Sequence, residues 1–256
     1  MSSMRWSISI GVCASVVLIA ASAPMVAQGA QPPVGYPTSQ VMINADNLEI
    51  GQIMPIRRGF WDADIAQGWG MDKAWHYHRL PSMIAQRNVM ESTNSIYRRS
   101  TGNYEMTAYA YEVECAIGST TDCEVVEEME VIGVYKPATL DTYYGWPVGG
   151  RMGLLTMYCD NWGVTECPWW VTFSLVNINP ATARPGGQVP LSAVPSPEPG
   201  LPADLRIAQD AFLDAPEVRA LTSRVKSGEL VMVSSYLPLI FPERHFSRDE
   251  LSDIVR

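Results

Sequence analysis

The chain has 256 residues, of which 47% are hydrophobic and 18% charged. This length and apolar content are enough for one sizeable core with an appendage. Eighteen Lys and Arg residues against 27 Asp and Glu residues give a formal net charge of −9 at pH 7. That charge argues against a protein that coats nucleic acid as a whole.

The first 30 residues have the pattern of an export signal. Arg5 is the only charged residue there, residues 8–20 are an apolar run, and small residues follow. We therefore expect residues 1–30 to be a signal peptide, cleaved after Gly29 or Ala30, and the mature protein to be secreted. The run is too short to span a bilayer, which takes about 20 apolar residues. An uncleaved membrane anchor is the alternative interpretation.

Charge is unevenly distributed along the chain. Residues 104–131 hold eight acidic side chains and no basic one, whereas residues 73–99 hold five basic side chains against Glu91 alone. The simpler interpretation is two solvated faces of opposite charge. The functional alternative is a local basic site. The basic residues are Lys73, Arg79, Arg87, Arg98 and Arg99.

Four cysteines beyond the signal form two pairs, and each pair encloses seven residues: Cys115 and Cys123, then Cys159 and Cys167. The flanking residues are typical of strands and the enclosed residues of turns. Two hairpins, closed by Cys115–Cys123 and Cys159–Cys167, explain this pattern best. The other two pairings remain formally possible. A four-thiolate metal site is the alternative, but its usual CxxC spacing is absent, so we expect no metal.

Local patterns predict an α+β fold. Residues 31–60 are extended and punctuated by Pro and Gly, and residues 61–102 resemble short helices. One helix is expected from Asp72 through His78, and a second has Pro81 in its first turn and ends at about Met90. Residues 103–178 are rich in strands, and residues 106–115 alternate as a half-buried strand does. Short N-terminal helices followed by an antiparallel sheet with two disulfide-closed hairpins are therefore expected.

The segment 180–203 contains seven prolines and three glycines, a composition typical of a linker. It separates a secreted α+β domain, residues 31–179, from a C-terminal segment, residues 204–256, of helix and strand. In that segment, Asp214 and Glu217 form a capping-box pattern, and Gly228 ends the helix that follows. Residues 230–240 then resemble a strand. Ser247 and Glu250 form a second capping box.

Three histidines are candidate site residues: His76, His78 and His245. Residues two positions apart on a helix point about 200° away from each other. His76 and His78 therefore cannot serve one site if their segment is helical. The helical interpretation turns His76 toward Asp72 and leaves His78 facing solvent. A lone histidine is also often a structural, hydrogen-bonded side chain.

Seven tryptophans beyond the signal could build a carbohydrate-stacking surface, although packing in the core is the simpler expectation. They are Trp61, Trp69, Trp75, Trp146, Trp162, Trp169 and Trp170.

Three segments carry a resemblance: GFWDADIAQGWGMDKAWHYHRL, SIYRRSTGNYEMTAYAYEVEC and MGLLTMYCDNWGVTECPWWV, all between residues 59 and 171. Together they are similar to a group of secreted actinobacterial proteins of uncharacterised function with a GxG–DKAYHKH / TAYC–CPxWV pattern. The layout also resembles small RNase toxin modules of the barnase/colicin/RelE-like class. The resemblance covers less than half of the chain.

The resemblance implies a site that cleaves RNA without metal or cofactor. By position it would take His78 as the general acid or base, Lys73 and Arg98 or Arg99 as phosphate clamps, and Thr156 and Tyr158 as hydrogen-bond donors. Histidine suits proton transfer near neutral pH, and cations suit the charge that develops on phosphate. The acidic strands oppose this chemistry, because phosphate binding needs local positive charge.

Three functions remain open from the sequence. The first is a secreted RNase-like effector or toxin that acts on RNA. The second is a non-enzymatic secreted binding module for a cell-envelope or host partner. The third is a metal-dependent hydrolase that uses His76 or His78 with nearby carboxylates. Convergence of His78, Lys73, Arg98 and Tyr158 on one cleft would favour an enzyme, whereas their dispersal would favour a binding module.

Overall fold

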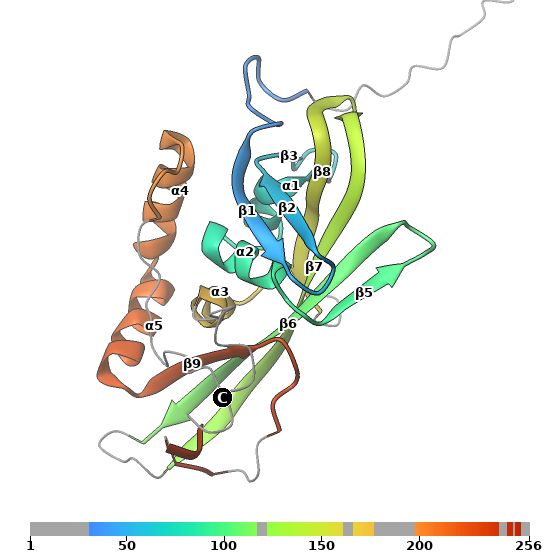
Figure 1. Ribbon diagram of the computed structural model, residues 1–256. Helices are drawn as coiled ribbons and strands as arrows, with labels where there is room; N and C mark the ends of the chain where they lie inside the picture. The colour runs from blue at the N-terminus through green and yellow to red at the C-terminus, as the bar shows by residue number, and fades with distance from the viewer. Residues whose placement is uncertain are drawn as a thin grey trace, which may run out of the picture.

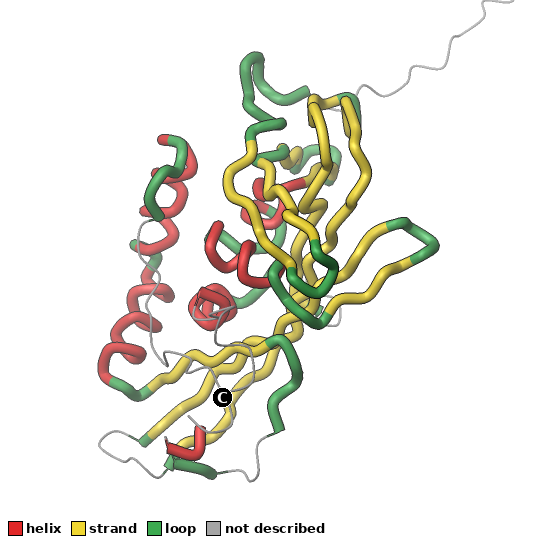
Figure 2. Tube along the Cα trace, viewed as in Figure 1, coloured by secondary structure: helices red, strands yellow, loops and turns green. Residues whose placement is uncertain are grey.

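The computed structural model describes residues 31–116, 122–160, 166–176, 198–240, 245–247 and 249–251. The signal peptide predicted for residues 1–30 and most of the predicted linker lie outside the described residues. The fold is α+β, with helices gathered on one side of an antiparallel sheet (Figures 1 and 2). None of the described helices is long and apolar enough to cross a membrane.

The central sheet contains five strands: β5 (Ser95–Arg98), β6 (Asn103–Cys115), β7 (Cys123–Tyr143), β8 (Trp146–Cys159) and β9 (Leu230–Ser235). Strands β5 to β8 lie side by side in chain order, and every neighbouring pair is antiparallel. The last strand, β9, pairs with the second half of β6. The C-terminal segment therefore completes the main sheet through β9.

Two short hairpins precede the sheet. The first joins β1 (Val41–Asn47) to β2 (Gln52–Arg57), and the second joins β3 (Phe60–Asp62) to β4 (Gln67–Trp69). The extended conformation expected for residues 31–60 is therefore that of paired strands.

Two short helices follow, as predicted, with shifted ends. They are α1 (Gly70–His76) and α2 (Met83–Met90). The N-cap of α2 is Ser82, whose hydroxyl accepts a hydrogen bond from the Ala85 N–H. Pro81 therefore lies before the helix rather than in its first turn. Ser82 is the cap because its hydroxyl satisfies an otherwise unpaired N–H of that turn.

Both predicted disulfides, Cys115–Cys123 and Cys159–Cys167, are present. The first closes the hairpin between β6 and β7, as expected. The prediction of a hairpin at the second pair was wrong, because the chain after Cys167 forms α3 (Trp169–Val176). Six of the eight residues of α3 are buried, so this helix is enclosed nearly all round. Such a run shows neither helical nor strand periodicity, and tertiary packing overrides its strand propensity.

Strand β6 is buried on both faces, so the expectation of a half-buried strand was also wrong. Met106 and Ala108 belong to the main core, whereas Tyr111 and Val113 belong to a second cluster formed with β9 and Phe246. The strand is covered twice because the C-terminal segment returns to its outer face. A pattern read from β6 alone does not contain that segment.

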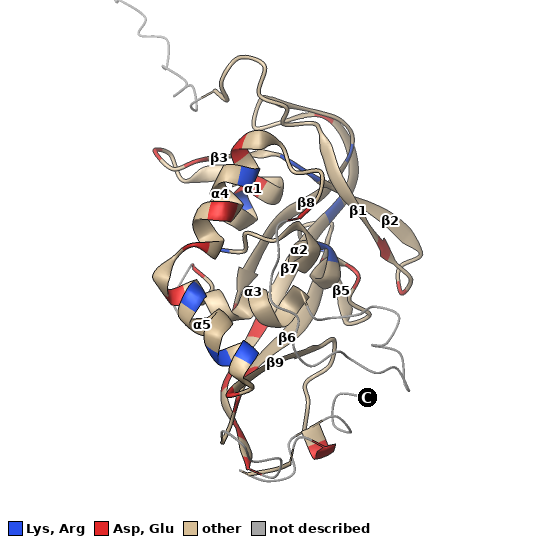
Figure 3. Ribbon diagram, turned by 90° about the vertical axis from the view of Figure 1, so that its left-hand side faces the viewer, with Lys and Arg blue, Asp and Glu red and all other residues tan. Residues whose placement is uncertain are grey.

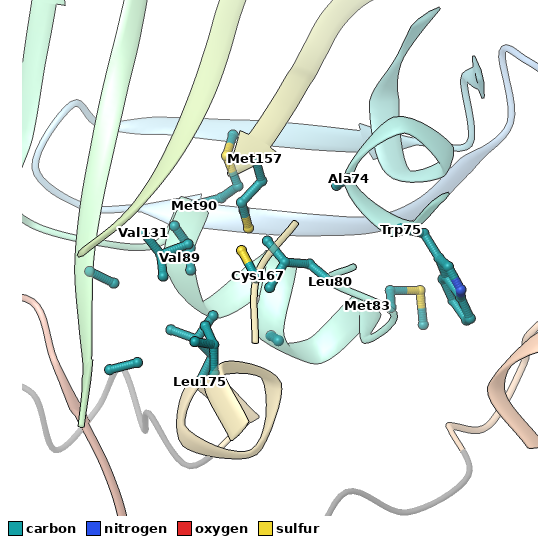
Figure 4. Packing of buried hydrophobic residues seen from close by; sticks show 14 of the residues in the cluster. Ala74, Trp75, Leu80, Met83, Val89, Met90, Val131, Met157, Cys167 and Leu175 are labelled. Atoms are coloured by element: carbon teal, nitrogen blue, oxygen red, sulfur yellow. The ribbon is translucent and has the colours of Figure 1, made fainter. Parts of the chain in front are cut away.

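The main core lies between the inner face of the sheet and helices α1, α2 and α3. Figure 4 shows Val89 and Met90 from α2 close to Val131 and Met157 from the sheet. Cys167 lies among these side chains, so the second disulfide is part of the main core. The first disulfide belongs to the smaller second cluster.

The C-terminal segment contributes α4 (Ala203–Leu213) and α5 (Pro216–Ser227) before β9. Gly228 ends α5 in the left-handed conformation, as predicted. The predicted first capping box was wrong, because Ala215 is the N-cap and Pro216 starts the helix. The second box is confirmed: the Glu250 N–H donates to Ser247 Oγ at 3.1 Å, and the Ser247 N–H donates to Glu250 Oε2 at 2.6 Å.

Candidate functional site

His78 is buried, with 7% of its surface exposed, whereas His76 is exposed. Helix α1 ends at His76, and Arg79 adopts a left-handed conformation with φ of 56°, so the chain turns before it reaches α2. The His78 carbonyl accepts a hydrogen bond from the Cys167 N–H at 2.9 Å. The expectation that His78 faces solvent was wrong, because the helical spacing on which it rested stops at His76.

A chain of ring contacts joins three of the predicted site residues. Lys73 Nζ lies 5.9 Å from the centre of the Trp61 ring, which stacks on Tyr77 at 4.3 Å. The Tyr77 ring meets His78 edge-on at 4.6 Å, and the His78 ring lies 5.8 Å from that of Tyr158. Lys73, His78 and Tyr158 therefore lie along one aromatic band rather than around a common point.

The remaining predicted residues lie on the outer face of the sheet. Through β7, Thr156 is in register with Glu105, and Tyr158 is in register with Thr107. Arg98 Nε pairs with Glu105 Oε2 at 2.6 Å. The structure thus brings Arg98, Thr156 and Tyr158 to one face. The Thr156 hydroxyl is buried there, and it has no hydrogen-bond partner among the described residues.

Most of the expected basic side chains are neutralised by partners. Arg79 pairs with Glu166 at 2.7 Å and Arg87 with Glu91 at 3.8 Å, in addition to the pair of Arg98 with Glu105. On the side of the molecule in Figure 3, Lys and Arg residues are interspersed with Asp and Glu. The predicted basic run therefore does not form an unpaired cationic surface.

Burial and neighbouring charges shift the pKa values of two residues along the band, Lys73 and Tyr158. Burial lowers the pKa of Lys73. Burial raises the pKa of Tyr158, and the carboxylates of Glu105 and Asp160 raise it further. A phosphate group at Tyr158 would meet these carboxylates, which is the opposite of what phosphate binding requires.

Sequence reasoning missed a buried ionic cluster around Arg58, which is 3% exposed. Arg58 Nε lies 3.7 Å from Asp72 Oδ1 on α1, and its Nη2 pairs with Asp204 at the start of α4. The Tyr36 hydroxyl donates to Asp72, and the Arg58 guanidinium lies 4.4 Å above the Tyr36 ring. Burial raises the pKa of Asp72 to about 6.

This cluster joins the N-terminal segment, the end of β2, α1 and α4. Arg58 and Asp72 are too buried for a substrate to reach them, so the geometry is that of a structural connection. His76 lies at the edge of the cluster and is exposed, and partial desolvation followed by the positive charge of Arg58 lowers its pKa. Only Asp72 had a sequence signal, because Arg58 and Asp204 are 146 residues apart.

Metal chemistry gains no support from the geometry. All four predicted cysteines are in disulfides, so they offer no thiolates. Among the described residues, no group of three or more His, Cys, Asp and Glu side chains could hold a metal ion.

Core packing is confirmed for four tryptophans, Trp69, Trp75, Trp146 and Trp170, which are buried. Trp61 and Trp169 are half-buried, and Trp162 lies outside the described residues. Among the residues that the structure describes, the large exposed aromatic side chains are instead two tyrosines, Tyr97 at 50% and Tyr144 at 47%. Neither had a sequence signal that distinguished it from the other tyrosines.

Tyr97 lies on the arm, the name used here for residues 95–106, in which β5 pairs with the start of β6. The arm projects from the body of the molecule (Figure 1). No protein-family model, curated protein or solved structure matches this chain. Its function must therefore be argued from its own residues.

Proposed function

We propose that this protein is a non-enzymatic extracellular binding module that holds a cell-envelope or host partner through its arm. The observation that carries this proposal is the projecting arm, which exposes Ile96 at 49% and Tyr97 at 50%. Exposed Arg98 and Arg99 adjoin them. Two disulfides suit the oxidising space outside the cytoplasm.

Neighbouring rings hold the Tyr97 side chain of the arm in place. The Tyr97 ring lies 4.8 Å from that of Tyr104 on the neighbouring strand, which in turn lies 6.1 Å from Tyr135. Tyr135 is fully buried, and its hydroxyl donates to Gln52 Oε1 at 2.8 Å. This row of rings connects Tyr97 to the core, so little side-chain freedom remains to be lost on binding. Tyrosine and arginine are also among the residues enriched in binding hot spots.

The same geometry gives less support to catalysis. His78 is buried, and the charge of Arg98 is neutralised by Glu105. A ribonuclease needs an accessible proton donor or acceptor and an available cation at the phosphate. An RNase-like site remains a second candidate, because His78, Tyr158 and Arg98 lie on or beside one band.

The test is binding of the oxidised mature protein to isolated cell envelopes and to intact host cells. We expect the double variant Ile96→Ser/Tyr97→Ser to weaken binding about tenfold or more, as loss of a hot spot does. Ile53→Ser is the matched control, because Ile53 is an exposed apolar residue on another hairpin. Equal binding by the arm variant and the wild type would contradict the proposal.

Incubation of the same protein with RNA separates the second candidate. The binding proposal predicts intact RNA with and without chelator. RNA cleavage that persists with chelator and disappears in His78→Ala would support the RNase-like site and oppose the binding proposal. The variant must remain folded, which its thermal unfolding reports, because His78 is buried.

A further inference from the structure

The turn between β7 and β8 holds a bulky residue where the backbone disfavours one. Tyr143 pairs with Trp146, so Tyr144 and Gly145 alone form the loop. Both have positive φ, 54° and 82°, as a type I′ turn requires. That turn prefers Asn followed by Gly, and positive φ is a genuine outlier for a bulky side chain. Such an outlier points to a role for the side chain itself.

The Tyr144 ring is held outward on an aromatic base. It lies 4.4 Å from the Tyr143 ring and 6.0 Å from the Trp146 ring, yet it is 47% exposed. Trp146 is buried and meets the Phe60 ring edge-on at 5.1 Å. The base thus fixes the exposed ring before any ligand arrives, which lowers the entropic cost of binding.

The groups around this ring select for a neutral ligand that forms hydrogen bonds. Burial, together with an interaction with the Tyr144 side chain, raises the pKa of Tyr143 to about 12, so the Tyr143 hydroxyl remains neutral. Exposed Asp141 and Thr142 immediately precede them. Residues 137–150 contain no Lys or Arg, and the whole chain has a net charge of −9. Asp141 is the only charged residue between Lys136 and Arg151, so the tip itself holds no cation that would bind an anionic polymer.

We propose that the tip, formed by Asp141, Thr142, Tyr143 and Tyr144, binds a neutral polysaccharide by stacking a sugar ring on Tyr144. The apolar C–H face of a pyranose matches an exposed aromatic ring. Its hydroxyls can form hydrogen bonds with the Tyr144 phenol and with polar side chains elsewhere on the tip, where Asp141 and Thr142 are exposed. This site rests on the proposed binding role of the protein, but it is separate from the arm.

The test uses retention of the oxidised mature protein on cellulose, chitin and amylose. We expect the wild type to be retained on at least one of them and to be released by soluble oligosaccharide of the same sugar. Tyr144→Asn should lose retention about tenfold or more. Its thermal midpoint should be unchanged or higher, because Asn-Gly suits the turn better. Tyr144→Phe keeps the ring and should keep most of the retention.

The arm variant Ile96→Ser/Tyr97→Ser is the matched control and should be retained as well as the wild type. No retention of the wild type on any of the three polymers would overturn the inference. So would equal retention of Tyr144→Asn, equal loss in Tyr144→Phe, or equal retention of the wild type on dextran sulfate. Arm-dependent envelope binding without polysaccharide retention would overturn the tip alone. Tyr144-dependent retention, combined with wild-type binding of the arm variant to cell envelopes and host cells, would overturn the arm alone.

Discussion

The two cysteine pairs have the same spacing and build different structures. Cys115 and Cys123 close a β-hairpin within a small cluster beneath the C-terminal segment. Cys159 and Cys167 join the end of a strand to the approach of a buried helix inside the main core. The first region carries a row of carboxylates after its second cysteine, whereas the second carries an apolar run.

The difference shows what a short cysteine spacing determines. A disulfide requires two nearby Cα atoms, and these lie 4.0 Å apart in the first pair and 5.4 Å in the second. A hairpin meets that requirement, and so does a strand followed by a tight return into a helix. The spacing therefore predicts the pairing, while burial decides which element follows.

The largest expected effect is that of removing a core side chain from α3. Phe173 is fully buried in the main core, so Phe173→Ala should cost about 3–5 kcal/mol of unfolding free energy. Val125, two residues after Cys123, is only partly buried, so Val125→Ala should cost about 1 kcal/mol. Urea unfolding of both variants measures the difference. Comparable losses would mean that the two regions contribute equally to the core.

Removal of each disulfide should give the next largest effect. Both pairs have a sequence separation of 8, so chain entropy alone predicts an equal loss of about 2–3 kcal/mol for each. Cys159→Ala/Cys167→Ala should lose about 1 kcal/mol more than Cys115→Ala/Cys123→Ala, because the sulfurs it removes are buried in the main core rather than in the smaller second cluster. Denaturant unfolding of the two double variants tests this order. A reversed order would assign the greater structural role to the hairpin.

Local sequence signals predicted the features that neighbouring residues determine by themselves. These include the left-handed end of α5 at Gly228, the capping box of Ser247 and Glu250, and both cysteine pairings. A glycine at a helix end or a hydroxyl three residues before a carboxylate acts within one turn. Such features need no information from distant parts of the chain.

Features that depend on distant partners were predicted incorrectly or missed. The helix at Trp169 depends on the core that surrounds it, and the burial of His78 depends on the docking of Cys167. Of the candidate site residues, Arg98, Thr156 and Tyr158 share one face, whereas His78 is buried and not exposed to solvent as its predicted helical spacing implied. The pairing of Arg58 with Asp204 was missed because it joins remote segments. For each such contact, the sequence pattern around one residue does not identify the distant partner.

A third variant tests a side-chain hydrogen bond that links the two regions. Trp170 lies three residues after Cys167, and Glu127 lies four residues after Cys123. Trp170 Nε1 donates a hydrogen bond to Glu127 Oε2 at 2.9 Å. Trp170→Phe should cost about 1–2 kcal/mol, because the bond involves a charged acceptor. A double-mutant cycle with Glu127→Ala measures the coupling. Trp169→Phe is the control and should cost less, since Trp169 is only half-buried. Zero coupling would mean that this hydrogen bond does not couple the two regions.

The smallest expected effect is the dependence of stability on pH in the first region. Glu112 of β6 lies opposite Glu127 in the β6–β7 pairing, and burial, followed by the Glu127 charge, raises the pKa of Glu112 above 4.5. The folded state therefore binds this proton more tightly than the unfolded state does. The contribution of Glu112 to stability is complete below about pH 4.5 and is lost as the pH rises through its folded pKa.

Glu112→Gln removes this loss, so the variant should exceed the wild type in stability at pH 8 by less than about 1 kcal/mol. Arg224, 3.9 Å from Glu112, keeps its pairs with Glu114 and Glu229. The advantage should shrink toward pH 4, which urea unfolding at both pH values measures. Glu166→Gln in the second region is the control and should change little, because its pair with Arg79 is exposed. If the advantage of Glu112→Gln does not vary with pH, titration of Glu112 is not its cause. The two regions would then differ in their charged residues but not in how their stability depends on pH.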